Sequence, residues 1–258
     1  MPDLKGLIFD VDGTLAENEQ NGHRVAFNRA FADAGLDWYW DEETYDRLLR
    51  VFGGKERMRY YIDDFLGGLE GVDDLDGFIR EVHASKTEHY GRLLRTGAIP
   101  LRPGIGRLIR EAHEAGLKLA IASTTTLTNA TTLLAQSLGD ESVTWFDVFA
   151  CGDVVANKKP APDIFLHALV ELGLEASECL AVEDSHSGLA SARAAGLRTL
   201  VTVSTSTLGQ DFTGAALVLD GLGEPGAPFM VLGGDAEGAR WVDVDFLRRL
   251  HARNKPGA

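Results

Sequence analysis

The sequence predicts an α/β protein: a doubly wound core built around a parallel sheet, with a helical domain inserted into it. Two observations lead to this prediction. Short aliphatic runs recur along the 258-residue chain and end in polar or glycine-rich turns, as do strands buried on both faces of a parallel sheet. Helix-length segments separate the later runs, with helix start and stop residues at their ends. Strand and helix in alternation are typical of doubly wound folds.

Each expected element has a local reason. The strands are expected where the runs are almost wholly apolar: Leu4–Phe9, Lys118–Ala122, Phe146–Ala150, Cys179–Val182, Thr199–Val203 and Ala216–Leu219. Three core helices are followed by a glycine, which favours a helix C-terminus: Gly104–Ala115, Pro162–Leu172 and Ser187–Ala195. The glycine-rich segment Gly221–Gly238 is expected to be a loop, followed by a last short helix at Val244–Ala252.

Residues 16–95 interrupt the alternation because they contain no convincing buried strand. Four helices are expected there: His23–Ala34, Glu42–Arg50, Arg57–Phe65 and Leu75–Leu94. The apolar residues of the first have the spacing of a one-sided helix. We therefore expect a core domain of residues 1–15 and 96–258 and a helical cap domain of residues 16–95.

Composition excludes several classes of protein. Hydrophobic residues make up 45% of the chain and charged residues 25%, which is typical of a globular protein. The formal net charge of −14 disfavours binding to a polyanion, so no nucleic-acid partner is expected. No apolar run approaches the roughly 20 residues that span a membrane, and the N-terminus does not resemble a secretory signal. The two cysteines, Cys151 and Cys179, favour a reducing compartment. We expect the cytoplasm, or the plastid stroma if a transit peptide has been removed.

Four polar motifs follow apolar runs or precede helices. They are Asp10-Val11-Asp12-Gly13-Thr14, Ser123-Thr124, Lys158-Lys159-Pro160 and Glu183-Asp184. The carboxyl ends of parallel strands meet at one edge of a sheet, where open α/β folds bind ligands. Taken singly, each motif has a structural alternative: an acidic turn, a helix N-cap or a solvated basic turn. Together and in this order, they indicate a catalytic site.

This constellation resembles the haloacid dehalogenase superfamily of phosphotransferases, with all four motifs in order from Leu4 to about Leu219. The resemblance implies a Rossmann-like core and an inserted four-helix cap. A closer resemblance is to the CbbY branch, the xylulose-1,5-bisphosphate phosphatases, which are close to β-phosphoglucomutase-type enzymes. It is carried by stretches such as Gly53-Gly54-Lys55-Glu56-Arg57, Leu101-Arg102-Pro103-Gly104-Ile105 and Thr124-Thr125-Thr126. The segment before the cap histidine is one residue longer than usual, which leaves open whether Glu17 or Glu19 faces substrate.

The chemistry assigns roles to the core residues. A phosphate monoester repels an anionic nucleophile, so a divalent cation is needed between them. Mg²⁺ prefers oxygen ligands, which Asp10, Asp184 and the backbone carbonyl of Asp12 would supply. Asp10 is expected to be the nucleophile and Asp12 the general acid and base. Lys159 would neutralise phosphate charge. The remaining expectations are that Ser123 and Thr124 bind phosphate and that Glu183 either orients the metal ligands without touching the metal or binds it through a water molecule.

The cap is expected to recognise the rest of the substrate. Residues 47–60 carry five cations and one acid, although the chain as a whole is acidic. The residues expected to contact substrate are Glu19, His23, Tyr45, Gly53, Gly54, Lys55, Arg57, Lys86, Thr125 and Thr126. Packing is an equal alternative for Tyr45 and His23. Trp38 and Trp40 are expected to pack within the cap, and Arg47, Arg50 and Arg59 to be solvated.

These expectations describe a Mg²⁺-dependent phosphatase that acts on a sugar bisphosphate. A β-phosphoglucomutase-like phosphotransferase is the enzymatic alternative, because an aspartate nucleophile does not determine whether water or a sugar hydroxyl accepts the phosphoryl group. A non-catalytic phosphoacceptor domain is a third possibility, disfavoured by the second aspartate and by the cap. The expected partner is a small-molecule sugar phosphate, with no membrane, nucleic-acid or obligate protein partner.

Overall fold

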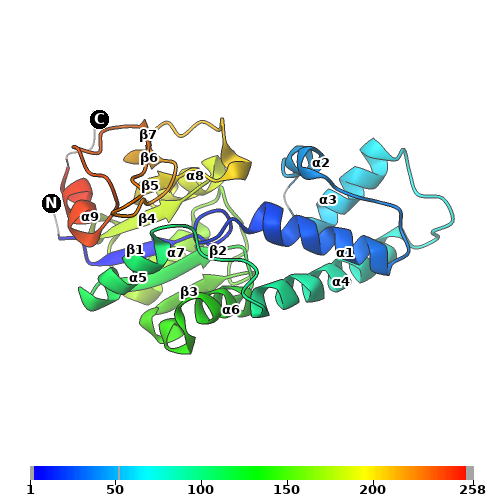
Figure 1. Ribbon diagram of the computed structural model, residues 1–258, viewed down its shortest axis with the longest axis horizontal. Helices are drawn as coiled ribbons and strands as arrows, with labels where there is room; N and C mark the ends of the chain where they lie inside the picture. Colours follow the sequence, from blue (N-terminus) through cyan, green and yellow to red (C-terminus); the bar gives the residue numbers. More distant parts are fainter. Residues whose placement is uncertain (1–2, 52, 254–258) are drawn as a thin grey trace. The chain divides into compact units, whose positions relative to one another are not determined.

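The computed structural model describes residues 3–51 and 53–253, which form two compact units (Figure 1). The core unit contains the described residues up to Glu17 and from Pro100 onward, and the cap unit is Asn18–Ile99. The cap unit therefore begins and ends slightly later than the expected cap of residues 16–95. Each unit buries its own apolar cluster, as an independent domain does.

In the described part of the core, seven strands form one sheet in the order β3-β2-β1-β4-β5-β6-β7. The strand bounds are β1 Gly6–Phe9, β2 Lys118–Ser123, β3 Val148–Cys151, β4 Cys179–Glu183, β5 Arg198–Thr202, β6 Leu217–Leu219 and β7 Val231–Gly233. All neighbouring strands are parallel except β6 and β7. The predicted α/β class with a mainly parallel sheet is confirmed.

Strand β1 lies in the middle of the sheet because the chain first extends it through β2 and β3 and then returns to its other side with β4. Phe9, the last residue of β1, pairs with Ile121 of β2 and Val182 of β4. The residues that follow these three strands are therefore brought to one edge of the sheet. This reversal of strand order is where doubly wound folds bind ligands.

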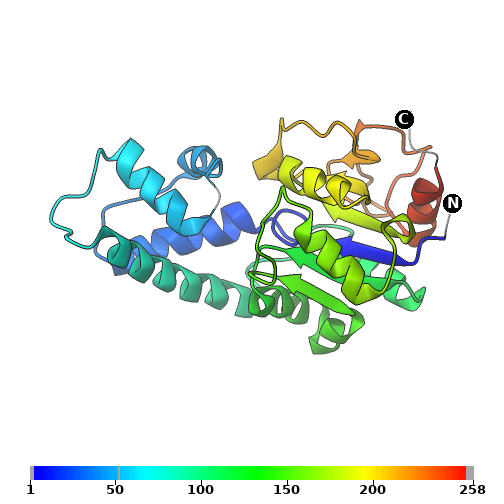
Figure 2. The same cartoon turned by 180° about the vertical axis from the view of Figure 1, so that it is seen from behind.

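Helices cover both faces of the sheet. The core helices are α5 Ile105–Glu114, α6 Leu127–Leu138, α7 Asp163–Leu172, α8 His186–Ala194 and α9 Val244–Ala252. Helices α7 and α8 pack on one face (Figure 2), and α5 and α6 contact strands β2 and β3. The buried cluster between α7 and the sheet is apolar and mostly aliphatic, with Ile8, Ala181 and Phe165 fully enclosed.

Two parts of the core differ from the sequence prediction. The segment Gly221–Gly238 was expected to be a loop, but it contains β7, which pairs antiparallel with β6. With three residues, β7 is too short to show an alternating pattern. Helix α6 was not predicted; it begins after Thr126, whose hydroxyl caps it by accepting a hydrogen bond from the Asn129 amide at 3.2 Å. Its polar threonines obscured the apolar stripe formed by Ala130, Leu133 and Leu134.

The cap is helical throughout its regular structure. It contains α1 Val25–Asp33, α2 Glu42–Leu48, α3 Gly54–Tyr60 and α4 Leu75–Arg95, together with two π-helical turns at Glu19–Arg24 and Tyr61–Phe65. Helices α1 and α4 pack side by side (Figure 1). Trp40 and Tyr45 are fully buried among Phe27 and Phe31, and Trp38 is nearly so. The prediction that both tryptophans pack within the cap is confirmed.

The first π-helical turn lies where the sequence carries one residue more than expected before His23. A π-turn accommodates one extra residue without ending the helix, and such turns are common at functional sites. The structure thus places Glu19 and His23 in the same turn, Glu19–Arg24.

Candidate active site

The turn after β1 brings the first aspartates against the fourth strand. The amide of Asp10 donates to the carbonyl of Val182 at 3.0 Å, which extends the β1–β4 pairing by one residue. Gly13 has a φ of +83°, and a Cβ atom there would lie only 2.1 Å from Oδ2 of Asp184. Glycine is therefore required at this position both by the backbone conformation and by the close approach of Asp184.

Three carboxylates gather at the carboxyl ends of β1 and β4. Oxygen atoms of Asp10, Glu183 and Asp184 all lie within 4.8 Å of one another, and all three residues are buried. Burial raises the pKa of each carboxyl above its ordinary value. Repulsion adds to the shift, from Asp12 in the case of Asp10 and from other members of the cluster in the case of Glu183 and Asp184. Such a concentration of buried oxygen donors and negative charge fits a hard divalent cation.

Lys159 provides the positive charge of this cluster. Its ammonium donates to Oδ1 of Asp10 at 2.7 Å and to Oε1 of Glu183 at 2.5 Å. Burial alone would lower the pKa of Lys159, but the two carboxylates outweigh it and raise the pKa above its ordinary value. Lys159 is therefore charged in the site at any physiological pH.

Glu183 is held from both of its oxygens. While Oε1 accepts from Lys159, Oε2 accepts from the amides of Asp184 and Ser185 at 3.0 and 3.2 Å and from the Ser185 hydroxyl at 3.1 Å. A Cβ atom on Gly188 would lie 1.9 Å from this carboxyl group, so only glycine leaves room for it at the start of α8. The backbone thus fixes the orientation of Glu183.

The hydroxyl residues at the end of β2 differ in burial. Ser123 ends β2 and is buried, and its hydroxyl accepts from the Thr125 amide at 3.3 Å. Thr125 is also buried, whereas Thr124 is exposed. Thr126 caps α6 and is exposed, which gives it a structural role of its own.

In the cap, Tyr45 forms hydrogen bonds with both an acidic residue and a basic residue. Its hydroxyl donates to Oε2 of Glu19 at 2.7 Å and accepts from Nη1 of Arg57 at 2.8 Å. Arg57 is buried and also lies 3.8 Å from Glu19. The structure therefore brings together three of the cap residues that the sequence singled out.

A second cap pair is formed by Lys86 and His23. The Lys86 ammonium lies 2.9 Å from Nδ1 of His23 and faces the rings of Phe27 and Tyr90 at 5.1 and 5.2 Å. Burial and the neighbouring charge of Lys86 lower the pKa of His23 to about 3. His23 is consequently neutral at pH 7, and its Nδ1 can accept a hydrogen bond from the Lys86 ammonium.

Helix α3 begins at the glycine pair. Gly53 has a φ of +91° and is the N-cap of α3, and Gly54 is its first helical residue. A Cβ atom on Gly54 would lie 2.5 Å from Nε2 of His83, a residue that sequence reasoning did not single out. Burial, followed by the charges of Lys86 and Lys55, lowers the pKa of His83 to about 4.

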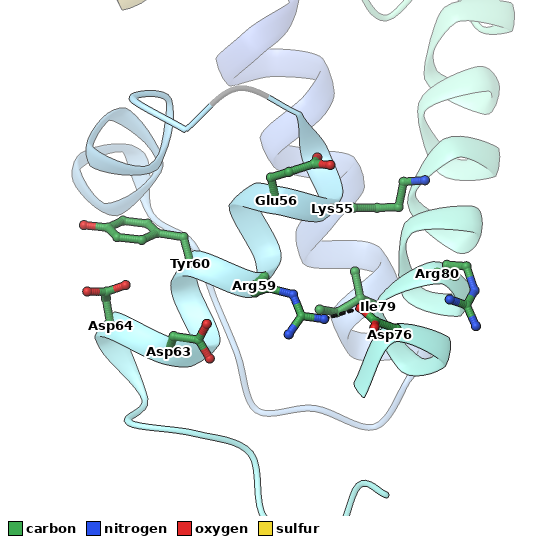
Figure 3. Close-up of a pocket in the computed structure, with 9 residues that line it drawn as sticks. All are labelled: Lys55, Glu56, Arg59, Tyr60, Asp63, Asp64, Asp76, Ile79 and Arg80. Atoms are coloured by element: carbon green, nitrogen blue, oxygen red, sulfur yellow. Dashed lines mark hydrogen bonds and ion pairs between the residues drawn. The ribbon is translucent and has the colours of Figure 1, made fainter. Parts of the chain in front are cut away.

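Lys55 lies apart from the Arg57 network. It is exposed in the first turn of α3 and lines a depression with Arg59, Asp76 and Arg80 (Figure 3). Arg59 forms an ion pair with Asp76 there, so its charge is already matched within the cap. The buried Arg57, in the same helix, contacts Tyr45 instead.

The two glutamates whose roles the sequence left open have different partners. Glu17 belongs to the core unit, where it lies 3.4 Å from Nε of Arg102 and accepts from the Thr205 hydroxyl at 3.0 Å. Glu19 belongs to the cap unit and accepts from Tyr45. Of the two, Glu19 is the one that shares a network with the cationic cap residues.

The fold and the motifs are those of a known class of enzyme, and the chain belongs to the haloacid dehalogenase-like hydrolase family, whose model matches residues 4–196. It is a phosphatase of that family, related to the CbbY proteins. The CbbY protein of Cupriavidus necator is 49% identical over 253 residues, which cover 96% of this chain and 97% of the relative.

Solved structures agree with this assignment. The crystal structure of CbbY from Rhodobacter sphaeroides in complex with phosphate is 44% identical, with a TM-score of 0.75 over 84% of this chain and 94% of that one. A structure of a mutant of the same protein holds xylulose-(1,5)bisphosphate; it is 43% identical, with a TM-score of 0.74 and the same coverage of both chains. Within residues 3–51 and 53–253, we find no helix long and apolar enough to cross a bilayer.

Proposed function

We propose that this phosphatase is a Mg²⁺-dependent enzyme that hydrolyses a sugar bisphosphate, with xylulose 1,5-bisphosphate as the best candidate. The observation that carries the proposal is the buried carboxylate cluster around Lys159, in a chain that also carries buried cations in its cap. The bisphosphate bound to the Rhodobacter sphaeroides protein supports this choice of a small-molecule substrate. The bacterial relatives and the two unpaired, buried cysteines support a cytoplasmic setting.

The core residues divide the chemistry between them. Asp10 attacks phosphorus through a carboxylate oxygen, and the bond from phosphorus to the sugar oxygen breaks as Asp12 gives that oxygen a proton. Asp12 then removes a proton from water, whose oxygen attacks the phosphorus of the aspartyl-phosphate and restores the Asp10 carboxylate. Inorganic phosphate and the dephosphorylated sugar are the products.

Mg²⁺, when bound, would neutralise charge on the transferring phosphoryl group, and Asp10, Asp184 and the carbonyl of Asp12 would hold it. Lys159 would contribute one positive charge, which the carboxylates and the phosphate would share. Ser123, Thr124 and the amides at the start of α6 and α8 would bind the phosphate oxygens, since helix N-termini favour anions. The orientation of Glu183 is fixed by the backbone, which suits a residue that aligns Lys159.

We propose that the cap holds the phosphate that is not cleaved. Arg57 and Lys86 are buried cations, and their partners Tyr45 and His23 add a hydroxyl and a neutral imidazole. Glu19 would accept from sugar hydroxyls. The Gly53-Gly54 amides at the start of α3 and the exposed Lys55 would complete the set in the cap. Thr125 and Thr126 are proposed as substrate contacts of the core unit.

The direct test measures the products formed from a ketopentose 1,5-bisphosphate with and without Mg²⁺. The proposal requires one equivalent of inorganic phosphate for each substrate consumed, and loss of turnover when the metal is chelated. Transfer of phosphate between sugar hydroxyls, with negligible release of inorganic phosphate, would instead identify a phosphoglucomutase-like transferase.

A further inference from the structure

Arg102 is a buried cation of the core to which neither the mechanism nor the sequence motifs give a role. Only 8% of the residue is exposed, and it lies just before α5. Its guanidinium donates to four backbone carbonyls: those of Gly13, Thr202 at 2.8 Å, Val203 at 2.7 Å and Asp220 at 2.9 Å. A planar fork of donors is suited to this task, and a lysine cannot reproduce it.

Three of the carbonyls that Arg102 binds, those of Gly13, Thr202 and Val203, belong to two segments beside Asp184. Gly13 lies so close that an added Cβ atom would overlap Oδ2 of Asp184. The same Cβ atom would lie 3.1 Å from the hydroxyl of Ser204, which follows Val203, so both segments meet at the Asp184 carboxyl. Arg102 therefore connects the two segments that enclose the Asp184 side chain.

The remaining contacts of Arg102 strengthen this arrangement. Its backbone amide donates to the carbonyl of Leu15 at 2.8 Å, so the residue is attached to the turn after β1 through its main chain as well. Its Nε faces Glu17 at 3.4 Å, and Glu17 also accepts from the hydroxyl of Thr205, beside Ser204. Arg102 is thus attached to the Asp10–Glu17 segment at two more points, and Glu17 itself contacts the segment at the end of β5.

We propose that Arg102 is a positioning residue that holds the Gly13 turn and the Val203–Ser204 segment against Asp184, and thereby sets the affinity of the site for Mg²⁺. The part concerning Mg²⁺ rests on the proposed function. Asp184 would be a ligand, and Arg102 does not touch the metal. Residues that orient metal ligands typically change metal affinity about 10–100-fold when replaced.

Arg107 offers a matched control. It is another arginine of the core that binds backbone carbonyls, those of Gly223 at 2.9 Å and Val242 at 2.8 Å, and it pairs with Glu224 at 2.8 Å. These partners lie in the segment between β6 and α9, not in the turns that carry the carboxylates. Loss of Arg107 removes a comparable set of hydrogen bonds and leaves the segments beside Asp184 unchanged.

The experiment compares Arg102→Lys, Arg102→Met and Arg107→Met in the full chain. Mg²⁺ binding is measured by calorimetry without substrate, and amide hydrogen exchange is measured on the metal-free proteins. We expect both Arg102 variants to bind Mg²⁺ about 10-fold or more weakly and to exchange faster in residues 10–17 and 203–207. Arg107→Met should retain the wild-type affinity and exchange faster only around its own partners, although its Tm also falls.

The outcomes separate the two proposals. If Arg102→Lys has wild-type Mg²⁺ affinity and wild-type exchange in both segments, the positioning role is wrong, even where Arg102→Met fails to fold. If Arg102→Met and Arg107→Met lose Mg²⁺ affinity equally, Arg102 is a general structural residue and the proposal is also overturned. If the wild-type protein binds no Mg²⁺, the metal part of the proposed function fails, and faster exchange confined to the two segments in the Arg102 variants still establishes the positioning role.

Discussion

The ammonium of Lys159 lies 2.7 Å from a carboxylate oxygen of Asp10, and both side chains are almost completely buried. The same ammonium contacts Glu183 at 2.5 Å, so one cation balances two acids inside the core. A buried ion pair contributes little net stability when intact, but removing one partner leaves an uncompensated charge. We therefore expect the loss of Lys159 to affect stability and, under the proposed function, turnover as well.

Lys159→Met should destabilise the metal-free protein by about 3–5 kcal/mol near pH 7, because two buried carboxylates lose their counter-charge. Turnover should fall by at least about 100-fold, as expected for loss of a charged contact to the transferring phosphate. Urea unfolding and initial rates of phosphate release measure the two effects. Lys158→Met is the control, since the adjacent lysine pairs with an exposed acid, Asp153, and should change stability by less than about 1 kcal/mol.

Asp10→Asn should abolish both turnover and the acid-labile phosphoenzyme while the fold persists. The asparagine retains the shape of the side chain and removes one of three mutually repelling charges, so the metal-free Tm should be unchanged or higher. Rapid acid quenching with radiolabelled substrate measures the phosphoenzyme. More than about 1% residual turnover would contradict the assignment of Asp10 as nucleophile.

Asp12→Asn should remove the acid–base step and leave Mg²⁺ binding nearly intact, because only the backbone carbonyl of Asp12 is proposed as a ligand. Asp184→Asn is the comparison, since its side chain belongs to the buried carboxylate cluster. Calorimetry on the two variants distinguishes the roles. Equal losses of Mg²⁺ affinity would mean that the Asp12 carboxylate is itself a ligand.

The stability of the cap should depend on pH through His23. The pKa of His23 falls from 6.5 to about 3 on folding, chiefly because of burial. Between these values the unfolded chain binds a proton that the folded chain does not, so stability is fully present above pH 6.5 and is lost as the pH falls toward 3. The loss approaches about 1.4 kcal/mol for each pH unit.

Urea unfolding from pH 7 to pH 4 tests this dependence. His83, with a pKa of about 4, acts in the same direction, and the buried carboxylates act in the opposite one because their pKa values are raised. The comparison with His23→Asn isolates the effect, since asparagine can still accept from Lys86 but does not titrate. If the wild type and this variant show parallel pH profiles, His23 is protonated in the folded protein and the prediction is wrong.

Periodicity and helix signals in the sequence were sufficient to predict most of the core, because most of its strands are short, almost wholly apolar runs and several of its helices are followed by glycine. The short β7 and the threonine-rich α6 lacked such signals and were missed. That Asp10 and Asp184, which follow β1 and β4, lie close together could be predicted, since parallel strands end at a common edge. The role of Arg102 could not, because its partners Gly13, Thr202 and Asp220 lie far away in the sequence.

In the cap, too, the sequence did not show which side chains would come into contact. The cluster of cations in residues 47–60 was visible in the sequence, but nothing there indicated which of them fold inward. The structure buries Arg57 against Tyr45 and leaves Lys55 exposed, although the two lie only two residues apart in α3. Burial beside aromatic rings distinguishes the cations that can hold a ligand anion strongly from those that water already solvates.

The final prediction concerns this distinction. Lys86→Met should raise KM for a sugar bisphosphate by roughly one to two decades, since a charge-assisted contact contributes about 1.5–3 kcal/mol. Methionine is an unbranched apolar side chain that can pack beside the rings of Phe27 and Tyr90, so the fold should survive the loss of the two cation–π contacts. Lys55→Ala should raise KM in the same direction but by less, because Lys55 is exposed. Hydrolysis of an aryl phosphate, which lacks the second anion, should change little in either variant.

Arg59→Ala is the matched control for this series. Arg59 lies in the same helix as Arg57 but is already paired with Asp76, so its loss should leave KM for the bisphosphate within about twofold. Steady-state kinetics with both substrates on all three variants measure the pattern. If Lys86→Met reduces activity on the aryl phosphate and on the bisphosphate by the same factor, Lys86 supports the structure of the cap and does not hold the second phosphate.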